Sequence, residues 1–88
     1  LHQNYPNPFN PVTTIQYDLP ENSQVQVAIY DMLGRKVRTL VSGFENAGFK
    51  AVQWQGRNDF GRSVGAGGYI YQIQAGDFLQ TRKMILLK

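Results

Sequence analysis

The fold is decided by a run in the last quarter of the chain, Tyr69-Ile70-Tyr71-Gln72-Ile73-Gln74-Ala75-Gly76-Asp77-Phe78. Every second position from Tyr69 to Ala75 carries a side chain suited to a core, and this period of two is typical of a strand with one buried face. Ala75-Gly76-Asp77 then turns the chain into a last strand, from Phe78 to Leu87. The run therefore predicts an antiparallel hairpin.

Working outward, the same alternation recurs through most of the chain, with turn residues between the alternating runs. No helical period interrupts it. We predict an all-β fold, an antiparallel, Greek-key-like β-sandwich of about seven strands that forms one domain over residues 1–88. The other expected strands are Ile15–Leu19, Val25–Tyr30, Lys36–Val41 and Phe49–Trp54, with loops at Ser42–Gly48 and Gln55–Gly68.

Length and composition exclude several classes of protein. The 88 residues are 42% hydrophobic and 17% charged, a globular balance with room for one thin core. There is no cysteine, which excludes disulfides and thiolate metal sites. The net charge of +3 is spread over scattered residues, so we expect no nucleic-acid partner. No stretch is long and apolar enough to span a membrane, and a start at Leu1 suggests a module of a longer protein.

Catalytic residues are scarce. His2 is the only histidine and lies near the chain start, whereas a general base needs a rigid setting. The six acids are spread over different turns and strand ends. We therefore expect no enzymatic activity and no cofactor.

A short loop offers the best candidate for a metal. Asn58-Asp59-Phe60-Gly61 places two oxygen-bearing side chains before a glycine, as calcium loops do. The same residues also form Asx turns without any ion, which is the interpretation we favour.

Three aromatic residues offer a candidate sugar platform: Trp54, Tyr69 and Tyr71. Rings at positions i and i+2 of a strand share one face, and such rings stack on sugars in binding proteins. The same spacing is also expected of rings that fill a core. We favour core positions for these rings, with Trp54 on the buried face of its strand, and keep the sugar platform as the alternative.

The N-terminal segment is stiff. Pro6, Pro8 and Pro11 fix their own φ angles and hold the preceding residues extended. We expect Tyr5 and Phe9 to anchor this segment to the sandwich. We expect a structural role, rather than a binding role, for the motif formed by Asn7, Pro8, Phe9, Asn10 and Pro11.

The C-terminal segment is apolar and flanked by charge. Met84-Ile85-Leu86-Leu87 lies between Arg82-Lys83 and Lys88. Such flanking charges protect an edge strand against aggregation. An exposed edge strand of this kind could also bind a partner by strand addition, with the charges setting its orientation.

Taken together, the motifs resemble the type A C-terminal sorting domain of type IX secretion substrates and the related immunoglobulin-like domain of the flagellar hook-capping protein. The resemblance runs over the whole chain. It rests on Gln3–Pro11, Thr14–Pro20, Ile29–Asp31 with Gly34-Arg35, Trp54–Gly56, Asp59 with Gly61, Gly67–Tyr71 and Thr81–Lys88.

This resemblance implies an immunoglobulin-like sandwich that directs a cargo protein, fused before it, through the outer-membrane translocon to the cell surface or beyond. A sortase-like surface peptidase would be a second partner. The matching residues imply that the translocon recognises Arg82, Lys83, Met84, Leu86, Leu87 and Lys88. The alternative is an accessory module of an extracellular hydrolase, serving as a spacer or binding carbohydrate through Trp54, Tyr69 and Tyr71.

Overall fold

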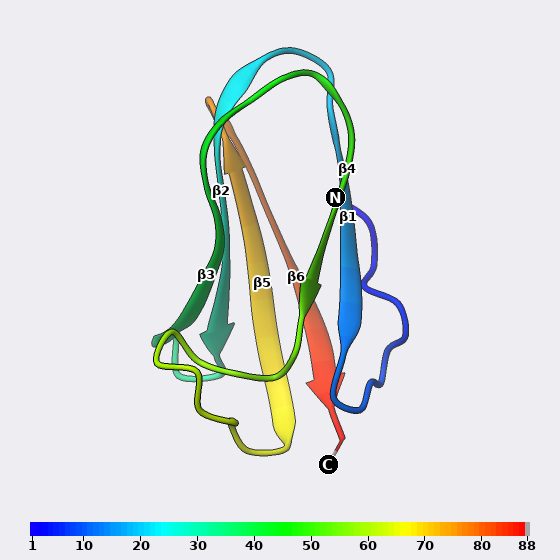
Figure 1. The fold of residues 1–88 in the computed structure, drawn as a ribbon, viewed down its shortest axis with the longest axis vertical. Helices are drawn as coiled ribbons and strands as arrows, with labels where there is room; N and C mark the ends of the chain where they lie inside the picture. The colour runs from blue at the N-terminus through cyan, green and yellow to red at the C-terminus, as the bar shows by residue number, and fades with distance from the viewer. Residues whose placement is uncertain (88) are drawn as a thin grey trace.

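The computed structural model describes residues 1–87 and confirms the all-β class, with six strands rather than about seven (Figure 1). The main difference lies in the third strand, which continues through the expected loop to Glu45 because Ser42 to Glu45 pair with the start of the second strand. The strands are β1 Thr13–Leu19, β2 Ser23–Asp31, β3 Lys36–Glu45, β4 Gly48–Trp54, β5 Gly67–Ala75 and β6 Phe78–Leu86.

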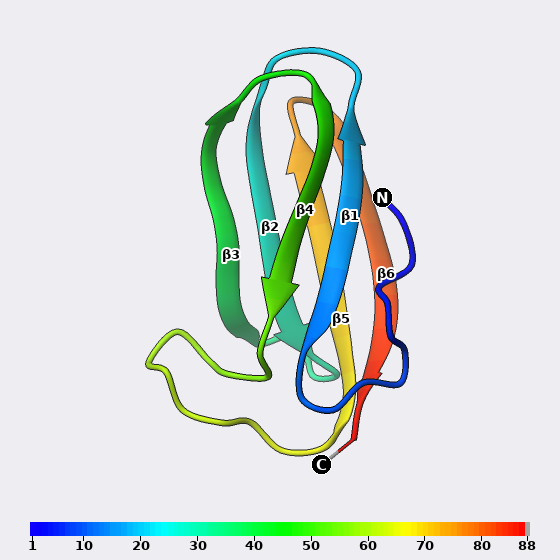
Figure 2. The same cartoon turned by 45° about the vertical axis from the view of Figure 1, so that its right-hand side comes forward.

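The strands form two antiparallel sheets that face each other. The larger sheet has the order β3-β2-β5-β6, and the smaller one pairs β1 with β4. The chain changes sheets between β1 and β2 and between β3 and β4, both over the upper end of the molecule in Figure 2, and again between β4 and β5. The predicted hairpin is present, with Ala75 opposite Phe78 and Gly67 opposite Leu86.

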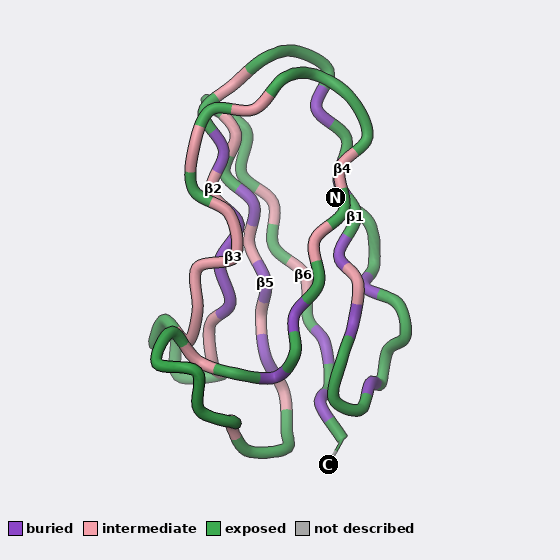
Figure 3. The backbone as a smooth tube through the Cα atoms, in the orientation of Figure 1, coloured by how far each residue is buried: buried purple, intermediate pink, exposed green. Residues whose placement is uncertain are grey.

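The core lies between the sheets, and Figure 3 shows that buried residues occur on every strand except β3. Trp54 is fully buried, and its ring meets that of Tyr69 edge to face at 5.2 Å between centroids. The Trp54 indole N–H donates to the carbonyl of Arg57 at 2.8 Å, so its one polar atom is satisfied. Each fully buried large side chain stabilises the fold by about 1.5–3 kcal/mol relative to an exposed position.

Candidate functional site: the paired chain termini

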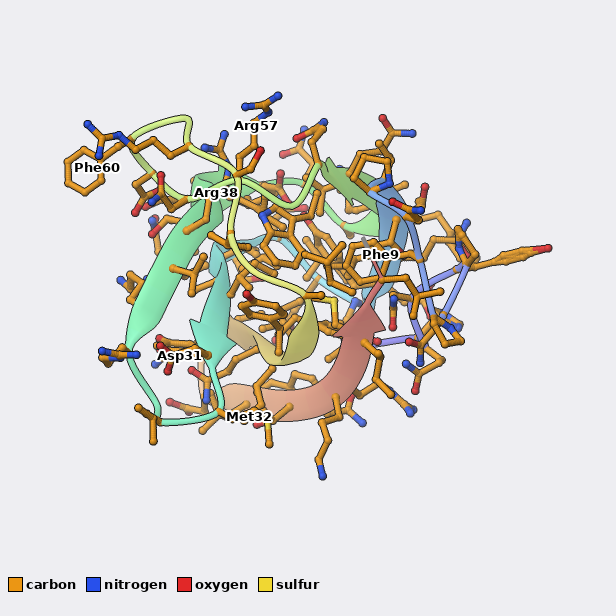
Figure 4. The ribbon with its side chains drawn as sticks, turned by 90° about the horizontal axis from the view of Figure 1, so that it is seen from below. Phe9, Asp31, Met32, Arg38, Arg57 and Phe60 are labelled. Carbon is orange, nitrogen blue, oxygen red and sulfur yellow. The ribbon has the colours of Figure 1, made fainter. Side chains whose placement is uncertain are left out.

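The site begins with Phe9, which the N-terminal segment inserts between the sheets. Phe9 is 1% exposed, and its ring lies 5.7 Å from that of Trp54. Its backbone N–H donates to Ile85 O at 3.1 Å, and its carbonyl accepts from the N–H of Leu87 at 2.8 Å. In Figure 4 Phe9 lies beside the end of β6. The predicted motif thus contacts the C-terminal segment directly.

Further bonds follow the same edge of β6. The N–H of Ile85 donates to Oδ1 of Asn7 at 3.0 Å, and Gln3 Nε2 donates to the Lys83 carbonyl at 3.0 Å. The Arg82 side chain donates to the carbonyl of Leu1 at 3.1 Å. The C-terminal half of this edge is therefore covered by the protein's own N-terminal segment. The expectation of an open edge available for strand addition is wrong at Ile85 and Leu87, because their outward N–H groups already donate to Asn7 and Phe9.

A buried asparagine holds the N-terminal segment in place. Asn4 is 2% exposed and donates from Nδ2 to Oγ1 of Thr13 at 2.9 Å and to the Pro6 carbonyl at 3.2 Å. The hydroxyl of Tyr71 accepts from the Asn4 N–H and donates to the His2 carbonyl, both at 2.8 Å. Burial of that hydroxyl raises the pKa of Tyr71. Sequence reasoning missed Asn4, since a single polar residue in an aperiodic segment carries no pattern.

The other motif residues lie at the surface. Pro8, Asn10 and Pro11 are exposed, and so is Tyr5 at 71%. Tyr5 contributes its backbone, which exchanges hydrogen bonds with Thr14. The expectation that its ring anchors the segment is wrong, because Phe9 alone of the two rings enters the core.

The predicted recognition residues divide between the two faces of β6. Met84 and Leu86 point inward and are each 1% exposed. Lys83 is exposed, and Leu87 is 48% exposed just beyond the strand. Arg82 lies at the edge, while Lys88 falls outside the described residues. In the folded domain, a partner can therefore contact only part of this set.

The three aromatic side chains of the predicted sugar platform are core residues. Trp54 and Tyr71 are 0% exposed and Tyr69 is 8% exposed. The Tyr69 hydroxyl also donates to the carbonyl of Gly65. Buried rings leave no face on which a sugar could stack, so the folded domain does not present this platform.

The candidate calcium loop is closed by its own hydrogen bonds. Oδ1 of Asn58 accepts from the N–H groups of Phe60 and Arg62 at 3.0 and 3.1 Å, which is an Asx turn. Oδ1 of Asp59 accepts from the N–H of Thr39 at 3.0 Å. Within residues 1–87, no three histidine, cysteine or acidic side chains are grouped to hold a metal. Phe60 projects from this loop into solvent (Figure 4).

The remaining catalytic candidates are involved in surface contacts. His2 Nε2 lies 2.9 Å from Oδ2 of Asp18, with both side chains about half exposed. Hydrogen bonds from Arg35 hold the pKa of Asp31 below its usual value.

Over the described residues, no helix is long and apolar enough to cross a membrane.

Comparison with known proteins decides the family. The pattern of the FlgD Ig-like domain matches residues 10–77, more than half of the chain. The chain belongs to the FlgD Ig-like domain family. No curated protein matches it significantly. The family match leaves out residues 1–9 and the whole of β6, which are the segments that pair with each other.

Several solved structures are similar to this FlgD Ig-like domain. Dimeric latent PorU from Porphyromonas gingivalis is 22% identical with a TM-score of 0.76, and the likeness covers 97% of this chain. PorZ, a surface component of the type IX secretion system of the same bacterium, is 21% identical with a TM-score of 0.68 over 98%. FlgD from P. aeruginosa is 25% identical with a TM-score of 0.66 over 84%.

This chain spans only part of those proteins. It corresponds to 9% of the PorU chain, 11% of the PorZ chain and 57% of the FlgD chain. At these identities, the PorU and PorZ structures show the shared immunoglobulin-like fold. The likeness covers nearly the whole length of this FlgD Ig-like domain.

Proposed function

We propose that this domain is a non-enzymatic C-terminal sorting domain, which directs a fused cargo through the type IX outer-membrane translocon to the cell surface or the extracellular space. One observation carries the proposal: the N-terminal segment fixes the basic, apolar β6 along its edge, so that Lys83, Ile85 and Leu87 face solvent in a set geometry. The fold shared with PorU and PorZ supports a link to this secretion system.

The mechanism follows from the two faces of β6. Met84 and Leu86 anchor the strand in the core, and the pairing with Phe9 holds its edge. A translocon component would then contact the outward side chains without having to order the segment. A partner that avoids this ordering cost binds more tightly. A sortase-like surface peptidase would act on the exported chain.

The test is export of a secreted reporter enzyme fused before residues 1–88, in a bacterium with a type IX secretion system. Substituting two exposed residues, Lys83→Glu with Leu87→Glu, should lower surface and medium activity about tenfold or more, because it replaces a basic, apolar contact by repulsion. A matched control on the projecting loop is Arg62→Glu with Phe60→Glu, which should export like the wild type.

Two results would count against the sorting role. One is a wild-type fusion that stays in the periplasm. The other is a double variant that exports as well as the wild type while its purified domain keeps its thermal unfolding midpoint. Both variants change exposed side chains, so the comparison separates recognition from folding.

A further inference from the structure

The outer face of the larger sheet carries a row of four residues, one from each strand. Tyr30 on β2 pairs with Lys36 on β3 and with Ile70 on β5, and Ile70 pairs with Lys83 on β6. Cross-strand partners share one face of a sheet. Their chain neighbours Ile29, Tyr71 and Met84 are buried, which places the row on the outside.

The apolar side chains of Ile85 and Met32 extend this row toward the C-terminal end of β6. Ile85 lies opposite Gly68 and is 47% exposed, and Met32 is 52% exposed. Met32 lies directly over Gly68, since a Cβ built on that glycine would approach Met32 Sδ to 3.3 Å. The small residue thus leaves room for a side chain from the β2–β3 turn, which lies at the outer side of the sheet in Figure 4. We call Tyr30, Met32, Lys36, Ile70, Lys83 and Ile85 the lysine-flanked face.

The charges at the two ends of the row form no ion pair with any residue that the structure describes. Among the described residues, the ion pairs are His2 with Asp18 and Arg35 with Asp31. Lys36 and Lys83 take part in neither, and they stand about 14 Å apart across three strand spacings of about 4.8 Å. The apolar residues between them are half-buried or exposed. Methionine and tyrosine are enriched at protein interfaces, where they fill the apolar centre.

We propose that a component of the export machinery recognises this domain at the lysine-flanked face. The partner's own surface would be an apolar patch bordered by carboxylates, which complements the apolar centre and the two lysines. The inference rests on the proposed function and adds to it. The recognised feature is not the C-terminal sequence alone, because Lys83 and Ile85 form one surface with residues more than ten positions distant in the chain. The signal exists only when the four strands are paired.

A protein partner fits this surface better than an anionic bilayer does. Electrostatic binding to lipids uses clusters of four to eight basic residues, whereas this face has two lysines at its ends. Ile70, at the centre of the row, lies on a strand between Tyr30 and Lys83 and is half-buried, so it does not project far enough to insert into a bilayer. Apolar centres with polar borders are typical of protein interfaces.

The experiment changes the face without touching residues 82–88, in the same reporter fusion. The face variant is Lys36→Glu with Tyr30→Thr and Ile70→Thr, which keeps β-branched residues in the strands. The matched control is Arg62→Glu with Gln26→Thr and Gln74→Thr, which makes the same kind of change on a loop and on the far half of the same sheet face. We expect the face variant to export about tenfold less and the control to match the wild type.

The outcomes separate the two proposals. If the face variant exports normally while Lys83→Glu with Leu87→Glu does not, the lysine-flanked face is overturned and the sorting role stands. If neither variant loses export, both fail. Should the face variant unfold on purification, the single change Lys36→Glu decides, because Lys36 is exposed and its substitution should leave the fold intact. A loss of about threefold is expected, and normal export would overturn the inference.

A lipid-binding assay tests the alternative partner, an anionic membrane surface. The purified domain is sedimented with vesicles containing anionic phospholipid, with the face variant beside it. We expect no binding by either protein. Binding by the wild type that the face variant loses would overturn the protein partner and assign the face to a membrane surface.

Discussion

At the scale of single residues, the stability of the paired termini depends on two side chains that differ in kind. Phe9 fills space between the sheets, whereas Asn4 satisfies polar groups that the N-terminal segment brings into the interior. Both lie in a segment whose other side chains are largely exposed. The motif therefore contains a few residues that hold the fold among several that do not.

Phe9→Ala tests the first of these residues. Removing a fully buried ring loses its transfer energy and leaves a cavity, so unfolding in urea should show a loss of about 3–5 kcal/mol. Phe60→Ala is the matched control, since Phe60 is 86% exposed and its loss should change stability by less than about 0.5 kcal/mol. Equal losses for the two variants would contradict the placement of Phe9.

Asn4→Ala tests the second. The substitution removes two side-chain donors and leaves the Pro6 carbonyl and the Thr13 hydroxyl with fewer partners, which should cost about 1–3 kcal/mol. Asn10→Ala changes the same residue type at an exposed position and should be near neutral. Chemical denaturation of the two variants distinguishes a buried polar network from a general preference for asparagine in this segment.

At the scale of elements, the edge of β6 is the part of the fold that sequence patterns did not predict. Alternation correctly predicted the burial of Trp54 and the pairing of β5 with β6. It did not predict the cover over β6, because the bond from Asn7 joins residues 78 positions apart and leaves no local period. The length of β3 was missed for a similar reason. Ser42 to Glu45 carry no inward apolar alternation, since their one large apolar residue, Phe44, is exposed, and only their pairing with β2 makes them a strand.

Amide hydrogen exchange can measure this cover within one strand. The N–H groups of Ile85 and Leu87 donate to the N-terminal segment and should exchange slowly. Thr81 points the same way along the edge, upstream of the covered part, and its amide should exchange faster by about tenfold or more. Phe9→Ala should speed exchange at Ile85 and Leu87 while leaving Thr81 unchanged. Uniform exchange along the edge would contradict the pairing.

The loop from Gln55 to Ala66 gives a second prediction at this scale. Because the Asn58 and Asp59 oxygens already accept from backbone N–H groups, calcium should not stabilise the domain. Millimolar calcium or excess chelator should leave the thermal unfolding midpoint within about 1 °C. A clear rise in the midpoint with calcium would show that the loop opens to bind the ion.

At the scale of the whole molecule, the two sheets are joined by polar contacts as well as by the core. The hydroxyl of Tyr17 on β1 donates to Oε1 of Glu45 at the end of β3, at 2.7 Å. Burial and the neighbouring Glu45 carboxylate raise the pKa of Tyr17 far above its usual value of 10.0. The neutral phenol is therefore favoured in the folded state.

The sign of the resulting pH dependence follows. A raised pKa in the folded state adds stability below the ordinary tyrosine pKa, and this contribution is lost as the pH rises above about 10, where the unfolded chain ionises. The unfolding midpoint should fall between about pH 9.5 and pH 11. Tyr17→Phe should be less stable at neutral pH and should lose less across that range. Parallel curves for the two proteins would exclude Tyr17 as the cause.

The bonds between Phe9 and the end of β6 also set an order of events for a chain made from one end. Residues 1–11 leave the ribosome before the rest of this domain, whereas β6, the strand that they contact, is made after the other strands. Contacts between such distant positions close late in folding because they carry the largest loop entropy. In a nascent or shortened chain that lacks β6, Phe9 therefore has no site in which to be buried, and its ring stays accessible to chaperones or proteases. Burial of Phe9 against β6 thus distinguishes a fully synthesised domain from an incomplete one.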